Sequence, residues 1–371
     1  MTSSTPRNQD AFNAHLAQLH MRGQWETDAA LNTERVDGPR SGALPYLWKW
    51  STVRDALSEA CEVVPESFTA RRTLAFLNPG LKDPGTTRTL SLAIQLVNAG
   101  EVAWAHRHSM AALRLGIEGS KQLYTVVNGE VLPMEPGDLV LTPSLTWHDH
   151  QNRSDEPGIW LDVIDAPLVG AIGQRWYEPF GDSVQPLRAA RGDYLVERAR
   201  PLRPTWEHRQ TVAIPYRYAW RDVREALDLY DPTTASPYDG VRLEYVNPMT
   251  GGPTLPTIGC FVQKLAPGSS TAEHQHTSND AFFVVAGRGR SVIEDTVLEW
   301  GKNDVFIIPT WMRHRHINDS PDAEAILFSV TDKPLLDALG LYRETPTPSG
   351  YLKPPPVVPG NTPPGSISHG S

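Results

Sequence analysis

Two pairs of histidines lie close together in the first half of the chain. His106 and His108 form a His-x-His pair, and His148 and His150 lie in a Trp-His-Asp-His run. In a β-strand, residues i and i+2 point to the same face, so each pair can direct two imidazoles toward one point. Imidazole is a good ligand for iron, zinc, copper and nickel. The stretch therefore predicts a metal site of undefined type, although a lone His-x-His pair is more often an ordinary structural feature.

The same arrangement recurs in the second half of the chain. His274 and His276 lie 168 residues after the first His-x-His pair, and His314 and His316 lie 166 residues after the second pair. A proline and an asparagine near the second pair keep the offset of 166 residues. Eight of the twelve histidines belong to these two sets. This regular spacing indicates a duplicated domain.

Two strand-like segments must position the first pair. They flank a turn at Asn98-Ala99-Gly100, and every second residue of each segment falls on one face. In the second segment, alternation places Arg114 on the same face as the two histidines. In the first segment, Gln95 shares a face with Ser91 and Ala93. We therefore expect Arg114 to face the metal site.

Composition limits the class of protein. The 371 residues suffice for two ordinary domains, and 40% hydrophobic with 21% charged residues suits a globular protein with a sizeable core. A net charge of -9 argues against nucleic acid as the main partner, because phosphate binding needs a basic patch. Two distant cysteines imply no disulfide framework. We found no signal-peptide-like or membrane-spanning segment, so we expect a cytoplasmic protein without a membrane partner.

These residues resemble the two sequence motifs of the cupin superfamily. The first copy of the motifs is Gly100-x5-His106-x-His108 with Gly137-Asp138-x4-Pro143-x4-His148-x3-Asn152, and the second is Gly268-x5-His274-x-His276 with Gly301-x2-Asp304-x4-Pro309-x4-His314-x3-Asn318. The resemblance implies a mainly β bicupin, with two antiparallel jelly-roll barrels and a few short helices. We expect an N-terminal arm and helix, a first and catalytic barrel, a connecting segment with a helix, a second barrel, and a C-terminal helix with a proline-rich tail, over residues 1–70, 71–170, 171–255, 256–332 and 333–371.

A narrower resemblance covers most of the chain, from about Trp25 to Tyr342. The segments ARRTLAFLNPGL, AHRH, GDLVLTP, WHDH and WLDVIDAP are similar to gentisate 1,2-dioxygenase and to relatives that cleave salicylates or 1-hydroxy-2-naphthoate. The resemblance implies an Fe(II)-dependent, extradiol-type dioxygenase that opens gentisate or a substituted salicylate between its carboxyl- and hydroxyl-bearing carbons with O2. It also implies a homotetramer. The alternatives are a 1-hydroxy-2-naphthoate dioxygenase, a different metal-cupin enzyme, and a non-catalytic bicupin.

The resemblance also assigns a metal set and pocket residues. It implies that Fe(II) is held by three histidines, which match His106, His108 and His148. Arg114 matches an arginine that binds the substrate carboxylate, a role that suits the guanidinium fork. Arg71 matches a second arginine of the pocket.

Three further positions match polar residues of the family's pocket. Gln95 matches a glutamine that bonds substrate or oxygen, and His150 is expected to donate or accept a proton near neutral pH. Asp162 matches an aspartate that orients His150 or a substrate hydroxyl. A purely structural role as a buried hydrogen-bond partner remains the alternative for Gln95 and Asp162.

The second copy of the motifs serves as an internal comparison. Its triad, His274, His276 and His314, is intact, so a second metal site is one possibility and a structural role is the other. Counting along the sequence places Phe282 at the position of Arg114 and Phe328 at that of Asp162. A pocket without the arginine is poorly suited to a carboxylate, so we expect catalysis in the first barrel only.

Substrate preference depends on the residues that depart from the family pattern. Ser91 stands where a bulky aromatic residue is common, and Ala93 is compatible with gentisate enzymes. Trp104 and Val163 also differ from the usual residues. A small side chain at Ser91 would enlarge the pocket for a substituted or bicyclic ring.

Overall fold

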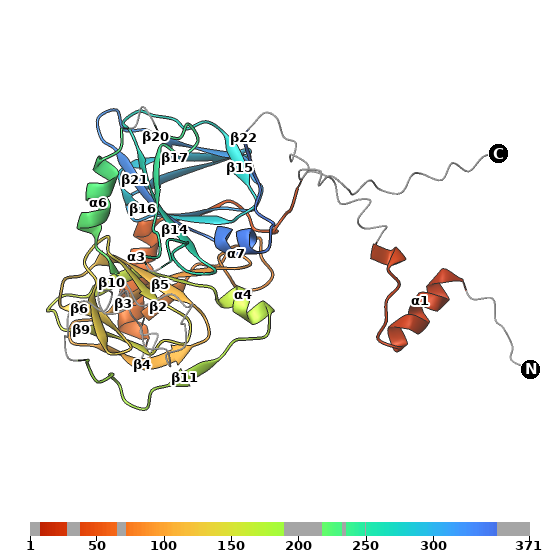
Figure 1. Cartoon of the computed structure of the whole chain (residues 1–371), viewed down its shortest axis with the longest axis horizontal. Coiled ribbons are helices and arrows are strands. Elements are labelled where there is room, and N and C mark those ends of the chain that lie inside the picture. Colours follow the sequence, from red (N-terminus) through yellow and green to blue (C-terminus); the bar gives the residue numbers. More distant parts are fainter. Residues whose placement is uncertain are drawn as a thin grey trace, which may run out of the picture. The chain divides into compact units, whose positions relative to one another are not determined.

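The computed structural model describes residues 8–27, 38–64, 72–188, 217–231, 235–248 and 250–346. Arg71 and the predicted proline-rich tail beyond residue 346 lie outside these residues. The chain divides into two compact units, Met1–Pro39 and Arg40–Ser371. The first unit contains helix α1 (Gln9–Gln18), and Phe12 of this helix stacks on Trp25, which follows it in the chain. The second contains all the strands of the described residues (Figure 1).

Each half of the second unit is built from a six-stranded and a five-stranded antiparallel sheet. In the first barrel the six-stranded sheet has the order β12 (Arg217–Tyr218), β8 (Leu139–Thr142), β5 (Ala112–Glu118), β10 (Gly158–Ile164), β3 (Ser91–Val97), β2 (Arg72–Ala75). Its five-stranded sheet has the order β11 (Tyr177–Pro179), β4 (Val102–His108), β9 (His148–Asn152), β6 (Leu123–Val127), β7 (Glu130–Pro133).

The second barrel repeats this plan. Its six-stranded sheet has the order β1 (Tyr46–Trp48), β19 (Val305–Ile308), β16 (Asp280–Ala286), β21 (Ala325–Thr331), β14 (Gly259–Leu265), β13 (Val241–Glu244). Its five-stranded sheet has the order β18 (Thr296–Gly301), β17 (Arg288–Ile293), β20 (His314–Asn318), β15 (His274–His276), β22 (Glu344–Pro346). The matching orders confirm the predicted mainly β bicupin.

Alternation along each strand divides the apolar residues among three cores. In β3, Leu92, Ile94 and Leu96 point into a core that both barrels share. Ala93 and Gln95 of the same strand face the inside of the first barrel, because successive side chains point to opposite faces. Each barrel also has an interior cluster of its own. The six-stranded sheets therefore pack against each other and leave their other faces free to line the two barrel interiors.

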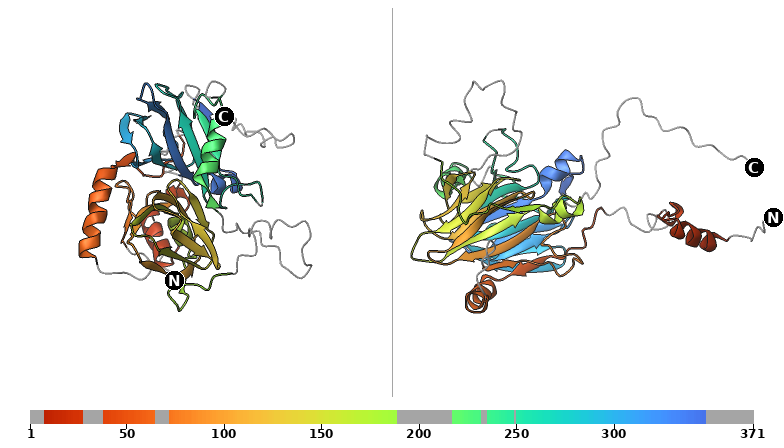
Figure 2. Two further views of the ribbon diagram at one scale, coloured as in Figure 1. Left: turned by 90° about the vertical axis from the view of Figure 1, so that its left-hand side faces the viewer. Right: turned by 90° about the horizontal axis from the view of Figure 1, so that it is seen from below.

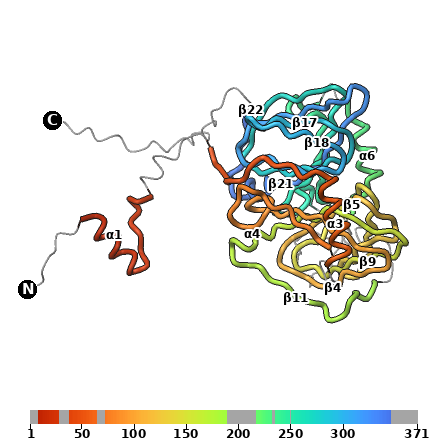
Figure 3. Tube along the Cα trace, turned by 180° about the vertical axis from the view of Figure 1, so that it is seen from behind, coloured from red at the N-terminus to blue at the C-terminus, as the bar shows by residue number. Residues whose placement is uncertain are grey.

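The barrels also exchange strands. Strand β1 precedes the first barrel in sequence but pairs with β19 of the second, and β12 precedes the second barrel but pairs with β8 of the first. Figure 3 shows the red-orange segment that contains β1 running along the second barrel before it reaches α3 (Trp50–Val63). An aspartate of each motif holds the tryptophan that follows the exchanged strand. Asp304 accepts a hydrogen bond from the Trp50 N–H at 2.7 Å, and Asp138 accepts one from the Trp220 N–H at 2.8 Å.

Helices α3 and α6 (Trp220–Asp228) follow the exchanged strands and lie at opposite sides of the barrel pair (Figure 2). Leu57 of α3 and Leu227 of α6 are fully buried in the shared core. The helix expected in the connecting segment is thus confirmed as α6. None of the helices within the described ranges is long and apolar enough to cross a membrane.

A pair of reciprocal hydrogen bonds joins the barrels through their repeat-related aspartates. Asp165 of the first barrel accepts from the Thr257 hydroxyl at 2.6 Å, and Asp332 of the second accepts from the Thr89 hydroxyl at 2.7 Å. Each aspartate precedes a short helix, α4 (Ala166–Ala171) or α7 (Lys333–Ala338). The predicted C-terminal helix is α7. Thr345 lies in β22, which pairs with β15.

Candidate active site

The three predicted metal ligands of the first barrel lie together. His106 on β4 is directly opposite His148 on β9, and His108 ends β4. The ring centroid of His148 lies 4.3 Å from that of His106 and 4.8 Å from that of His108. One ligand nitrogen from each residue lies within 4.8 Å of the other two, and all three side chains are buried. This spacing suits a single metal ion at their centre.

The backbone orients each imidazole. The Nδ1 atoms of His106, His108 and His148 contact the carbonyl oxygens of Trp104, Met110 and Thr146 at 2.7, 2.9 and 2.9 Å. A carbonyl oxygen accepts only, so Nδ1 carries the proton and Nε2 keeps its lone pair. The Nε2 atom of His148 is buried and has no hydrogen-bond partner among the described residues. The donor set therefore fits a divalent metal ion.

Burial keeps these imidazoles neutral, as metal ligation requires. Desolvation lowers the pKa of His106 to about 4, although its bond to the Trp104 carbonyl opposes the shift. Desolvation and the neighbouring His106 lower the pKa of His108 to about 4. Burial also holds the pKa of His148 well below its usual value. Three neutral donors leave the positive charge of a bound cation available to anionic ligands.

Arg114 reaches the site by a different path from the predicted one. The chain leaves β4 at His108 and enters β5 at Ala112, so Arg114 lies in the opposite sheet of the barrel and not farther along the same strand. Its Nη1 donates to the Thr142 hydroxyl at 2.6 Å, and its Nε lies 3.0 Å from Oδ1 of Asp162. The positive charge of Arg114 lowers the pKa of all three histidines, so it faces the triad as expected.

Asp162 and Arg114 form a buried ion pair. Their side chains are 15% and 6% exposed. The contact does not have hydrogen-bond geometry, and both Nε and Oδ1 are without hydrogen-bond partners in the described structure. Burial raises the pKa of Asp162, and the neighbouring guanidinium opposes that shift. The described side-chain contacts of Asp162 are with Arg114 and Trp160 and do not include His150, so the orientation of a substrate hydroxyl is the role that stays a prediction.

His150 lies on β9 two residues after His148, and its ring centroid is 5.9 Å from that of His148. Its Nδ1 contacts the Thr125 hydroxyl at 2.8 Å. Desolvation, followed by the charge of Arg114, holds the pKa of His150 well below its usual value. Of the two roles expected for His150 near neutral pH, proton donor or proton acceptor, the neutral imidazole suits the acceptor.

The other residues singled out from the sequence differ in where they lie. Gln95 is buried and pairs in register with Trp160, and Ala93 pairs with Asp162, so both belong to the inner face. Val163 belongs to the core between the barrels and does not line the site. Trp104 is 41% exposed.

Sequence reasoning missed three residues of the site. Thr142 holds Arg114 and Thr125 holds His150, as described above. Tyr177 on β11 stacks on His106, with ring centroids 5.3 Å apart. Strand alternation would have placed Thr125 on the inner face, but Tyr177 lies beyond the motifs in the connecting segment.

The second barrel differs most at the position of the arginine. Phe282 occupies the place of Arg114, as predicted, and stacks on Phe306 with centroids 4.8 Å apart. The prediction that Phe328 replaces Asp162 is wrong. Asp162 pairs with Arg114, and the residue that pairs with Phe282 is Ser329. Phe328 instead belongs to the core between the barrels.

Comparison with known proteins agrees with this geometry. The cupin domain model matches residues 93–164 and 261–331. The chain is 42% identical over 352 residues to a 1-hydroxy-2-naphthoate 1,2-dioxygenase from Nocardioides sp. (strain KP7), covering 94% of this chain and 91% of that protein. It is 39% identical to a 5-aminosalicylate 1,2-dioxygenase from Comamonas sp, covering 90% and 89%. A gentisate 1,2-dioxygenase from Haloferax sp is 37% identical, covering 89% and 94%.

A solved structure has the same fold. Salicylate 1,2-dioxygenase from Pseudoaminobacter salicylatoxidans, in its adducts with gentisate, superposes with a TM-score of 0.79 at 30% identity. The match covers 94% of this chain and 96% of that one. With two cupin barrels, a buried histidine triad and these full-length relatives, the chain belongs to the bicupin family of gentisate, salicylate and hydroxynaphthoate 1,2-dioxygenases.

Proposed function

We propose that this protein is an Fe(II)-dependent dioxygenase that opens the ring of an aromatic hydroxy acid. The bond broken lies between the carboxyl-bearing and hydroxyl-bearing carbons, and O2 is the second substrate. The observation that carries the proposal is the buried Arg114, held by Thr142 and Asp162 in the barrel that also contains the histidine triad. A storage barrel needs no such cation.

The metal site supports iron through its donor set and its family. Three neutral imidazoles suit several first-row metals, and iron is the choice that the family supports. When bound by His106, His108 and His148, Fe(II) supplies coordination positions for the substrate's carboxylate and ortho oxygen and electrons for reaction with O2.

Arg114 orients the substrate. Its guanidinium matches a carboxylate in charge and in geometry, and its buried Nε has no hydrogen-bond partner within the described structure. Thr142 and Asp162 fix the side chain before substrate arrives, so little orientational freedom is lost on binding. Arg71, which lies outside the described residues, is assigned to the pocket on the resemblance alone.

His150 accepts the proton of the substrate's ring hydroxyl. In its neutral form, one ring nitrogen contacts Thr125 and the other is available to accept that proton as the substrate binds. Gln95 on the inner face provides a hydrogen bond to the substrate or to oxygen.

The substrate class is gentisate or a substituted salicylate. A second candidate is 1-hydroxy-2-naphthoate, which the 42% identity to a naphthoate enzyme favours. Small side chains at Ser91 and Ala93 on the inner face also leave room for a second ring. The reaction is extradiol-type only in a loose sense, because these substrates carry a carboxyl group, and not a second hydroxyl group, beside the ring hydroxyl. We also propose a cytoplasmic homotetramer.

An oxygen-uptake screen tests this function. The protein is loaded with Fe(II) without air and mixed with gentisate, salicylate, 5-substituted salicylates or 1-hydroxy-2-naphthoate, and oxygen is then admitted. We expect oxygen uptake and loss of the aromatic absorbance with at least one of them. No uptake with any substrate would refute the proposal.

A further inference from the structure

The second barrel has a histidine triad with nearly the same geometry as the first. His274 on β15 is directly opposite His314 on β20. The ring centroid of His314 lies 4.3 Å from that of His274 and 4.9 Å from that of His276. The corresponding distances from His148 in the first barrel are 4.3 and 4.8 Å. Its ligand nitrogens also lie within 4.8 Å of one another, and all three side chains are buried.

We infer that the second barrel binds a divalent metal ion of its own, in a site that excludes organic acids. This inference goes beyond the proposed function and does not depend on it. Two of the three rings are anchored as ligands usually are. The Nδ1 of His314 contacts the Met312 carbonyl at 2.9 Å, and that of His276 contacts the Ser278 hydroxyl at 2.9 Å. The buried Nδ1 of His274 has no hydrogen-bond partner among the described residues.

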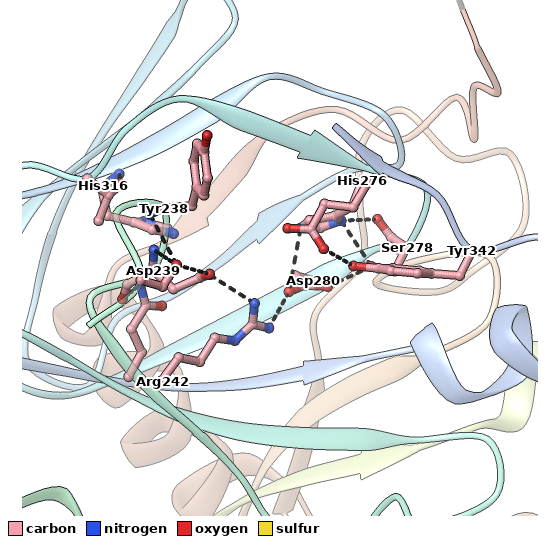
Figure 4. A network of polar contacts seen from close by, with 12 residues as sticks. Tyr238, Asp239, Arg242, His276, Ser278, Asp280, His316 and Tyr342 are labelled. Carbon is pink, nitrogen blue, oxygen red and sulfur yellow. Dashed lines mark hydrogen bonds and ion pairs between the residues drawn. The ribbon is translucent and has the colours of Figure 1, made fainter. Parts of the chain in front are cut away.

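Carboxylates surround this second triad. Asp280 Oδ2 lies 3.9 Å from Nε2 of His276, at a position where the first barrel has Ala112 (Figure 4). Asp239 is a second carboxylate of this barrel, and Arg242 joins it to Asp280. Negative charge around neutral ligands favours retention of a cation.

The guanidinium of Arg242 in this barrel is already paired with carboxylates. Arg242 on β13 donates to Asp239 and to Asp280, each at 3.0 Å, as the dashed lines in Figure 4 mark. It also lies over the Phe261 ring, 4.2 Å from the centroid. Arg114 of the first barrel faces one carboxylate, whereas Arg242 faces two. Among the described residues, the Arg242 guanidinium is therefore less available than that of Arg114 to the carboxylate of an organic acid.

Aromatic side chains fill the interior behind the second triad. Phe282 stacks on Phe306, and Trp300 stacks on Phe306 from the other direction with centroids 6.2 Å apart. Phe282 also packs edge-on against His316, at 5.0 Å. In the first barrel the positions of Phe282 and Phe306 are Arg114 and Val140. The space and charge that would hold an aromatic acid are thus replaced by packed rings.

Cobalt stoichiometry tests the second site. The full-length protein is stripped of metal with a chelator, dialysed against Co(II) without air, and analysed for bound cobalt and for its visible absorbance. We expect two Co(II) per chain in the wild type. His148→Ala and His276→Ala should each bind one, and the double variant none. His15→Ala, which removes an exposed histidine outside both barrels, should still bind two.

Salicylate tests the exclusion of organic acids. It should change the cobalt spectrum of His276→Ala, which keeps the first site, and leave that of His148→Ala unchanged. One Co(II) per chain in the wild type would overturn the second site, and this result needs no variant to fold. An equal response to salicylate in His148→Ala would overturn the exclusion. Neither outcome depends on ring-opening activity, so the inference and the proposed function fail separately.

Discussion

Replacing Arg114 with methionine should separate the two roles of this residue, in stability and in turnover. The variant removes one partner of a buried ion pair and leaves Asp162 without a counter-charge. Breaking a buried pair in this way typically costs about 3–5 kcal/mol of unfolding free energy. It also removes the contact to the substrate carboxylate, and loss of a buried charged partner costs about 2–5 kcal/mol, or roughly 30- to 5,000-fold in kcat/KM.

The pH dependence of the Arg114→Met variant follows from Asp162. Burial raises the pKa of this carboxyl in the folded protein, and Arg114 is the main influence that opposes the rise. Without the arginine the folded-state pKa rises further. A carboxyl whose pKa is raised by folding stabilises the protein fully at low pH and loses that contribution as pH rises through the folded-state value. The destabilisation relative to wild type should therefore grow from mildly acidic to neutral pH.

Urea unfolding at several pH values and oxygen-uptake kinetics measure these effects. The double variant Arg114→Met/Asp162→Asn should regain stability at neutral pH and remain inactive. Arg54→Met is the matched control, since it breaks an exposed pair with Glu118 and should cost about 0–1 kcal/mol. Wild-type turnover in Arg114→Met, or a pH-independent loss of stability that Asp162→Asn does not relieve, would contradict this reasoning.

Three other perturbations test the framework around the site. Thr125→Val removes the hydrogen bond to Nδ1 of His150, and we expect a lower kcat with unchanged iron content, measured together on one sample. Asp165→Ala and Asp332→Ala each break an inter-barrel bond and should cost about 1–3 kcal/mol in urea unfolding without loss of metal. Deleting residues 1–48 removes β1, so hydrogen exchange should quicken in β19 of the second barrel and not in β8 of the first.

The duplication and the histidine triads could be predicted from the sequence alone, because both copies have the same spacing between their histidines. The prediction failed at Phe328 because six residues separate Asn318 from the next strand, whereas five residues separate Asn152 from its next strand. A shift of one residue moves a side chain to the other face of a sheet. Register in the folded sheet was therefore needed to identify Ser329 as the counterpart of Asp162.

Other features depend on long-range pairing that local patterns do not encode. Arg242 lies outside both motifs, and only its pairing with β14 brings it into the second barrel. Arg114 was assigned to the correct face for the wrong reason, since the chain changes sheets between His108 and Ala112. The depressed pKa of His150 likewise follows from burial, which the spacing of histidines does not reveal.

The most direct test of the central claim is the fate of the oxygen atoms. The Fe(II)-loaded protein is mixed with the substrate selected by the uptake screen under 18O2, and the product is analysed by mass spectrometry. Ring opening by a dioxygenase predicts a ring-opened product that carries both atoms of one 18O2 molecule. A product that keeps its ring, or one whose new oxygen comes only from water, would contradict the account.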